Sequence, residues 1–199
     1  MANLIRIADG IDVSPFLAEL EADPLAWYDN VNRQMYIGVQ QHTQSIRLRT
    51  AKTDPSPSVA SSQDILESQT LSQYQNFPEA WKFCTNYTAS QNGMLGWVSY
   101  IKLFPRKQIY PHRDDGLYYA LRDRYHLVVK SVKGSIFRVG SQTVTMYPGE
   151  FWVFNNKLEH EVFNPSDEDR IHLVFDMFPN PGSGYFTNTT INIQPDNPE

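Results

Sequence analysis

Residues 110–116, YPHRDDG, place a histidine two positions before one aspartate and three before another. On an extended backbone His112 and Asp114 point to the same side, because side chains alternate between faces, and Asp115 points away. An imidazole and a carboxylate on one side suit a hydrogen-bonded pair, a general base with its orienting partner, or two ligands of one metal ion. The H-x-D pattern is common by chance, so its meaning depends on residues further along the chain.

A second histidine, His160, follows a turn and opens the short apolar segment HEVF. Together with His112 and Asp114 it would supply two imidazoles and one carboxylate. That set is the facial triad of non-haem Fe(II) oxygenases, which leaves the remaining positions of an octahedral ion open. The alternative interpretation of His160 is an ordinary turn or core histidine.

Two later segments each carry an arginine and a histidine two residues apart. They are RYHLVVK at residues 124–130 and RIHLVFD at residues 170–176. In each segment, alternation puts the arginine and histidine on the face opposite the bulkier apolar side chains. That face is either exposed to solvent or lines the interior of a barrel that binds a polar ligand. The residues concerned are Arg124, His126, Arg170 and His172.

Arg170 favours the interpretation of a barrel with a polar ligand, because burying a guanidinium without an anion costs free energy. Its planar fork suits bidentate binding of a carboxylate. A dioxygenase with a facial triad needs an electron-donating cosubstrate, and one held by its carboxylates would explain an inward arginine. The alternative is a surface ion pair within DEDR, residues 167–170.

The elements that would position these residues begin at residue 94. Short segments rich in Val, Ile, Tyr, Phe and Trp follow one another up to residue 178, separated by turn sequences such as KG, PG and NPSDED. Short strands at this spacing predict a sandwich, a jelly roll or a small barrel.

Before residue 94 the chain is mixed and partly helical. One helix is predicted to start with Ser14 as N-cap and Pro15 as its first residue, and to stop at Pro24. Further predicted elements are helices over 62–75 and 77–87 and a flexible loop over 42–63, with a lid over the site as the less favoured interpretation of the loop. We expect one domain over 1–199, with a helical or mixed layer at 1–93, a β core at 94–178 and a polar tail at 179–199.

The composition sets wider limits. The 199 residues are 41% hydrophobic and 20% charged, as in ordinary globular proteins. A net charge of −5 gives no electrostatic basis for binding nucleic acid or an anionic membrane. Cys84 is the single cysteine, so no disulfide forms within the chain. No segment has the apolar length of a signal peptide or a membrane span, and we expect a cytosolic location.

Four segments, in this order and at this spacing, resemble the aspartyl/asparaginyl β-hydroxylase family. They are HRD, RYH, PGEFWVFNNKLEHEVFN and RIHLVFD. The resemblance covers about residues 94–178. It implies a mainly β (α+β) fold, with a double-stranded β-helix core of the jelly-roll, cupin-like kind. It also implies an enzyme that uses Fe(II), 2-oxoglutarate and O₂. Such an enzyme hydroxylates an unactivated C–H bond of an amino acid or of an aspartyl- or asparaginyl-type residue, with release of succinate and CO₂.

By position, the resemblance makes His112 and His160 iron ligands and Arg170 the anchor of the distal carboxylate of 2-oxoglutarate. Arg124 and His126 match the R-x-H pair beside the cosubstrate. Animal members of the family lack a carboxylate at the position of Asp114, whereas some bacterial relatives, including free-proline hydroxylases, keep H-x-D. Since this chain has the fuller triad, we expect Asp114 to be the third ligand.

Two other classes of protein remain open. One is a non-catalytic cupin-like module that binds a metal or a small molecule, and it would not need both Arg-x-His strands facing inward. The other is an interaction protein whose barrel has lost its metal. In the favoured interpretation the partner is a small-molecule or peptide substrate, with no role for nucleic acid or membrane.

Overall fold

The computed structural model describes residues 2–29, 38–52 and 66–187, and its β-strands fall into two antiparallel sheets. The strands are β1 (Leu4–Ala8), β2 (Thr43–Ala51), β3 (Ser68–Thr70), β4 (Met94–Leu103), β5 (Gln108–His112), β6 (Asp123–Lys130), β7 (Ile136–Val139), β8 (Gln142–Val144), β9 (Phe151–Phe154), β10 (His160–Phe163) and β11 (Arg170–Phe178). The large sheet has the order β1-β9-β6-β11-β4-β2-β3, and the small sheet has the order β5-β10-β7-β8. This arrangement is the predicted jelly roll.

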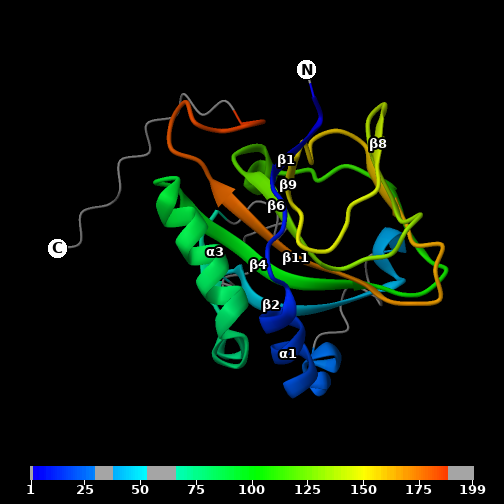
Figure 1. Ribbon diagram of the computed structural model, residues 1–199. Helices are drawn as coiled ribbons and strands as arrows, with labels where there is room; N and C mark the ends of the chain where they lie inside the picture. Colours follow the sequence, from blue (N-terminus) through cyan, green and yellow to red (C-terminus); the bar gives the residue numbers. More distant parts are fainter. Residues whose placement is uncertain (1, 30–37, 53–65, 188–199) are drawn as a thin grey trace.

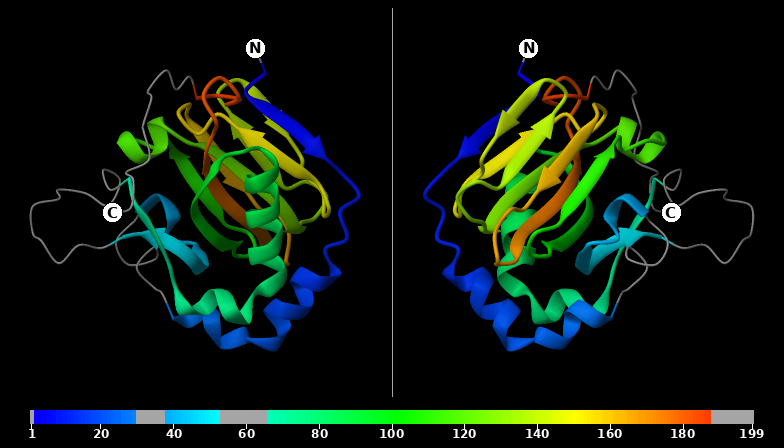
Figure 2. Two further views of the ribbon diagram at one scale, coloured as in Figure 1. Left: turned by 90° about the vertical axis from the view of Figure 1, so that its left-hand side faces the viewer. Right: turned by 90° about the vertical axis from the view of Figure 1, so that its right-hand side faces the viewer.

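The two longer helices cover one face of the large sheet. The α-helices are α1 (Ser14–Ala22), α3 (Pro78–Ser90) and the single turn α4 (Leu117–Ala120), and the 3₁₀ segments are η1 (Pro24–Tyr28), η2 (Gly38–Gln40) and η4 (Ser72–Asn76). Figure 1 shows α1 and α3 on one side of the large sheet and β8 of the small sheet on the other side. The two side views in Figure 2 show the same layers, with α3 lying across the sheet. The inner face of the large sheet is therefore left to face the small sheet.

Strict alternation along the central strands divides the core in two. Tyr125, Leu127 and Val129 of β6 pack against the helices, whereas Val128 packs between the two sheets. On β11, Leu173 and Phe175 likewise pack toward the helices. The polar positions of these strands therefore face the barrel interior, and the interpretation of a polar face inside a barrel is confirmed.

Two predictions for the N-terminal part are wrong. Ser14 is the first residue of α1 and not its N-cap, and the Asp12 carboxylate accepts its backbone N–H at 2.9 Å. The helix predicted over 62–75 is replaced, in its described part, by β3 and η4. The helix predicted over 77–87 is confirmed as α3, and it begins at Pro78 as expected.

The N-terminal layer also contains strands that were not predicted. β1, β2 and β3 all join the large sheet, and β2 occupies much of the segment expected to be a loop. The rest of that segment, including any lid over 53–65, lies outside the described residues. Because both parts of the chain build one sheet, they support our proposal of a single domain, but the boundary at 93 does not separate a helical layer from a β core. No helix among the described residues is long and apolar enough to cross a membrane.

Candidate metal centre and the adjoining cavity

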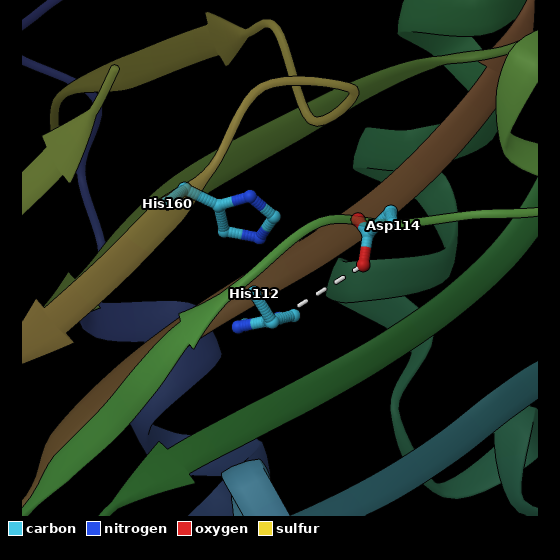
Figure 3. A group of neighbouring side chains, drawn as sticks. All are labelled: His112, Asp114 and His160. Carbon is cyan, nitrogen blue, oxygen red and sulfur yellow. Dashed lines mark ion pairs between the residues drawn. The ribbon is translucent and has the colours of Figure 1, made fainter. Parts of the chain in front are cut away.

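His112, Asp114 and His160 come together at the edge of the small sheet (Figure 3). His112 is the last residue of β5 and His160 the first of β10, and the two are direct cross-strand partners. Asp114 lies two residues beyond the end of β5. One ligand atom from each of the three residues lies within 4.8 Å of the others. Asp115 is exposed and is not part of the group, as the alternation predicts.

Backbone carbonyls orient both imidazoles. The Nδ1 atom of His112 lies 2.8 Å from the carbonyl oxygen of Tyr110, and Nδ1 of His160 lies 3.0 Å from that of Leu158. A carbonyl only accepts, so each Nδ1 carries the proton and donates it. Each Nε2 is then left with its lone pair free. This is the outer arrangement typical of metal-binding histidines, in which one ring nitrogen is fixed by a hydrogen bond and the other binds the ion.

Asp114 is held by one oxygen only. Its Oδ2 accepts hydrogen bonds from Arg124 Nη1 at 2.7 Å and from Asn156 Nδ2 at 3.1 Å. The other oxygen, Oδ1, lies 4.0 Å from Nε2 of His112. One carboxylate oxygen is thus committed to the protein, and the second faces the histidines.

The protonation states favour a cation site. Burial lowers the pKa of His160 to about 4, so its ring is neutral at neutral pH. Burial alone would raise the pKa of Asp114, but the Arg124 charge, the two histidines and the Asn156 amide together lower it. The group therefore offers an ionised carboxylate and a neutral imidazole, which are the forms that bind a metal.

Arg124 lies between two carboxylates. Besides its bond to Asp114, it makes a bidentate pair with Asp176, with distances of 2.7 and 2.9 Å. Its guanidinium also lies 4.8 Å from the centre of the Tyr119 ring. Arg124 was expected beside the cosubstrate, and the structure brings it to the third expected metal ligand. Asn156, Asp176 and Tyr119 were not singled out from the sequence. Of these three, only Asp176 could have been found from the sequence, because alternation puts it on the same face of β11 as Arg170 and His172.

The other predicted residues lie further along the inner face of the large sheet. Nδ1 of His126 lies 3.2 Å from Nδ1 of His172, and Arg170 Nη2 donates to the same atom of His172 at 3.3 Å. If His172 Nδ1 accepts, its ring proton lies on Nε2, and that buried atom has no partner among the described residues. Arg170 is 4% exposed, and no carboxylate among the described residues pairs with it.

A cavity of about 360 Å³ opens beside the metal centre. His112, Asp114 and Arg124 line one part of it, and residues of β2 and β4 line another. This volume lies within the ordinary range of small-molecule sites, about 300–1,000 Å³. Arg170 and His172 are not among the lining residues, so they lie outside this cavity.

The group fits a divalent iron ion better than a structural zinc ion. Three ligands on one face of an octahedral ion, with bonds near 2.1 Å, lie about 3 Å apart, so the observed spacing needs only a small contraction. Two neutral imidazoles with one carboxylate form the set typical of non-haem Fe(II) oxygenases. Thiolates, which many structural zinc sites use, are absent from the group.

Comparisons with known proteins identify the family and the fold. The family model described as aspartyl/asparaginyl beta-hydroxylase matches residues 60–179, more than half of the chain. No curated protein sequence matches. A solved oxidoreductase of the 2OG-Fe(II) oxygenase family from Burkholderia pseudomallei is similar in fold, with a TM-score of 0.59 at 10% identity, covering 94% of this chain and 89% of that one.

A second structure with the same fold is a Pseudomonas putida prolyl-4-hydroxylase, with a TM-score of 0.51 at 14% identity. The alignment covers 89% of this chain and 93% of that one. At such identities the two structures show the fold alone, whereas the family match includes every residue of the metal centre and Arg170. The chain belongs to the aspartyl/asparaginyl β-hydroxylase family and is a hydroxylase.

Proposed function

We propose that this hydroxylase is an Fe(II)- and 2-oxoglutarate-dependent dioxygenase. In this proposal His112, Asp114 and His160 hold the iron, and Arg170 holds the distal carboxylate of 2-oxoglutarate. The reaction inserts one oxygen atom of O₂ into an unactivated C–H bond of an amino acid or of an aspartyl- or asparaginyl-type residue. The other oxygen atom enters succinate as 2-oxoglutarate loses CO₂.

Arg170 is the observation that carries the cosubstrate assignment. Burial lowers the pKa of Arg170 to about 9, yet the side chain remains a cation at neutral pH. Its one hydrogen-bond partner among the described residues is His172, which supplies no negative charge. A buried cation without a counter-ion is costly, so the site calls for an anion from outside the chain. The unpartnered Nε2–H of His172 is a second donor in the same region.

The protein's own residues hold and orient the reacting groups. The carbonyls of Tyr110 and Leu158 keep both Nε2 lone pairs directed at the ion, and Arg124 keeps one oxygen of Asp114 occupied so that the other is free. When bound, Fe(II) supplies the activation of O₂ that no side chain provides. Arg170 orients the cosubstrate by binding the carboxylate that the metal does not take.

Replacing Arg170 tests this assignment. Arg170→Gln removes the charge, and truncating one partner of a buried charge pair costs about 2–5 kcal/mol. We expect the apparent KM for 2-oxoglutarate to rise on the order of 10²-fold. Arg170→Lys, which keeps a charge but loses the bidentate fork, should be intermediate. The measurement is 2-oxoglutarate titration of succinate formation at saturating Fe(II), with prime substrate or in uncoupled turnover.

Arg106 provides a matched control. It is an exposed arginine that pairs with Asp167, so Arg106→Gln should leave the KM for 2-oxoglutarate unchanged. Iron affinity should stay near the parent value in all three variants, since neither arginine is a ligand. Unchanged 2-oxoglutarate binding in Arg170→Gln would show that the anchor is misassigned. Binding of metal and 2-oxoglutarate without any succinate formation would favour the non-catalytic cupin-like module.

The choice of partner and compartment extends the same proposal. A net charge of −5 gives no basis for a nucleic-acid or membrane partner, and the single cysteine is typical of a reducing compartment. We therefore propose a cytosolic enzyme that acts on a small molecule or a peptide.

A further inference from the structure

The cavity beside the metal centre has an excess of positive charge. Its described lining contains four arginines and two aspartates. Both aspartates, Asp114 and Asp176, are already paired with Arg124. A divalent metal ion and the dianion of 2-oxoglutarate cancel each other, so their joint binding leaves this excess unchanged. The described lining therefore has no free carboxylate that could pair with an ammonium group, but it has arginines that are not paired with a carboxylate.

Two of the lining arginines, Arg47 and Arg113, make no hydrogen bond or ion pair with any described residue. Arg113 is exposed, whereas Arg47, on β2, is half-buried. Burial lowers its pKa, which a nearby anion would oppose. Its neighbour Arg49 differs, because its Nε donates to the Leu95 carbonyl at 3.3 Å and its Nη1 to Thr70 Oγ1 at 2.8 Å. Arg47 is thus the half-buried cation of the lining that is open to a ligand.

The sheet register separates Arg47 from the cosubstrate anchor. Arg47 pairs with Ser99, and Ser99 pairs with Val174, so Arg47 lies two strands, or about 10 Å, across the sheet from Val174. Arg170 lies four residues, or about 13 Å, along β11 from Val174. The two backbone positions are therefore roughly 16 Å apart. Arg47 lines the cavity and Arg170 does not, so they are placed to bind different anions.

The rest of the lining suits a body that is partly apolar. Trp97, Ile101 and Val174 line the same cavity, from the inner faces of β4 and β11. An anionic group with an attached apolar body would pair with Arg47 and cover these apolar side chains.

We infer that the substrate is a small carboxylate-bearing molecule with net negative charge, whose carboxylate is bound by Arg47 and whose apolar part lies against Trp97, Ile101 and Val174. This inference rests on the proposed function for the role of the cavity. It makes Arg47 a specificity-determining residue. It also predicts that a free amino acid, whose ammonium group finds no free carboxylate in the described lining, binds less well than its N-acyl derivative.

Matched pairs of compounds test the charge preference. N-acetyl-L-leucine, N-acetyl-L-valine, N-acetyl-L-proline and N-acetyl-L-aspartate would be compared with their free amino acids. Binding to the full chain loaded with Mn(II) and 2-oxoglutarate is measured by calorimetry without O₂, and succinate formation is measured with Fe(II). We expect at least one N-acetyl compound to bind about 10-fold or more tightly than its parent. Equal or tighter binding of the free amino acids, or no binding in either series, overturns the inference.

Variants then identify the residue responsible. Arg47→Gln should weaken the best N-acetyl ligand by about 10- to 30-fold, near the low end for truncating a buried charge pair because Arg47 is only half-buried. It should leave the affinity for 2-oxoglutarate unchanged, and Arg106→Gln should change neither affinity. An Arg47→Gln variant that loses 2-oxoglutarate binding would make Arg47 the cosubstrate anchor, and one that keeps full N-acetyl affinity would remove its role.

The two proposals fail in distinguishable ways. If 2-oxoglutarate does not bind or turn over, the proposed function fails. The N-acetyl ligands can still be titrated against the protein loaded with Mn(II) alone. If their affinity depends on Arg47, the anion site is still supported. If 2-oxoglutarate binds in an Arg170-dependent manner but the ligand series shows no preference for the anion, only the substrate assignment fails.

Discussion

Each of the three expected metal ligands is held by a hydrogen bond at an atom other than the one that faces the other two residues. The residue types could be predicted from the sequence, since alternation puts His112 and Asp114 on one side and Asp115 on the other. Their orientation could not be predicted, because it depends on the carbonyls of Tyr110 and Leu158 and on the distant Arg124. The two histidine contacts are local, each to the carbonyl two residues earlier, but the residue types do not give the ring rotamer that makes them. The contact of Arg124 with Asp114 forms only in the folded protein.

The neighbouring aspartates provide a sharp test of the ligand set. Asp114→Ala removes an ionised, buried ligand oxygen, and it also leaves Arg124 without one of its partners. We expect the affinity for Fe(II) or Mn(II) to fall by at least 10-fold, since losing even an outer-sphere partner of a metal site typically costs about 10- to 100-fold. Asp115→Ala, at an exposed position, should leave the affinity nearly unchanged. Metal titration followed by calorimetry measures both.

Two outcomes would contradict this assignment. An equal loss of metal affinity in both variants would mean that the backbone from 112 to 115 does not alternate as described. Full activity in Asp114→Ala would mean that the two histidines suffice for the metal, as in the animal members of the family.

Among the elements, β2 was the largest error in prediction. Its buried Ile46 and Leu48 alternate as a strand requires, but residues 42–63 were interpreted as a flexible loop because a stretch rich in Ser, Pro and Thr follows them. Arg47 and Arg49 of this strand line a cavity, so a charged residue here marks the inner face of the sheet and not the solvent. The strands from 94 onward could be predicted because they are rich in β-branched and aromatic residues and are separated by turn sequences. The cavity that these arginines line forms only when the protein folds, so it could not be predicted from the sequence.

The attachment of α3 depends on a side chain from α1. Phe77, the residue before α3, supplies no side-chain cap, and Glu19 of α1 accepts the backbone N–H groups of Glu79 and Ala80 at 2.9 and 3.1 Å. The same carboxylate accepts the hydroxyl of Tyr100 on β4. One buried side chain therefore joins two helices and the sheet, and it satisfies donors that a helix start leaves open.

Glu19→Ala should therefore lower the free energy of unfolding more than a typical substitution on an exposed helix face. Losing a cap costs about 0.5–2 kcal/mol, and leaving buried donors unpaired costs about 1–3 kcal/mol. We expect a loss of roughly 2–3 kcal/mol in the free energy of unfolding, measured by urea denaturation. Glu21→Ala on the exposed side of the same helix is the control, with a change within about 0.5 kcal/mol. Similar small changes in both variants would show that α3 does not depend on Glu19.

Over the whole molecule, the two halves of the chain contribute different parts of the site. The family match over 60–179 contains the three expected metal ligands and Arg170, whereas β2 with Arg47 lies before it. The chemistry shared by the family thus comes from the matched segment, and the proposed recognition of the substrate's charge comes from a strand outside it. The large sheet brings both together, because β2 pairs with β4 and β4 with β11.

The barrel interior also determines how the protein responds to acid. Burial lowers the pKa of His126, His160 and His172, with that of His160 reaching about 4. In the unfolded chain these rings titrate near pH 6.5. Between about pH 6.5 and pH 4 the unfolded state therefore binds more protons than the folded state, and the free energy of unfolding rises with pH in that window. Glu19, whose pKa burial raises, acts in the opposite sense, but it is one group against three.

We predict that the metal-free protein keeps nearly constant stability between about pH 7 and pH 7.5 and loses it as the pH falls toward 4. A ring that stays neutral down to pH 5 contributes a loss of at most about 2 kcal/mol there, at about 1.4 kcal/mol per pH unit. Urea denaturation with a chelator present, at intervals from pH 7.5 to 4.5, measures the slope. The double variant His126→Gln, His172→Gln should have a lower stability at pH 7.5 but a flatter dependence on pH, because two of the three proton-binding differences are gone. A parent protein whose stability does not change between pH 7 and 5 would mean that these rings are protonated in the folded barrel, and the neutral donor–acceptor pair beside Arg170 would then be wrong.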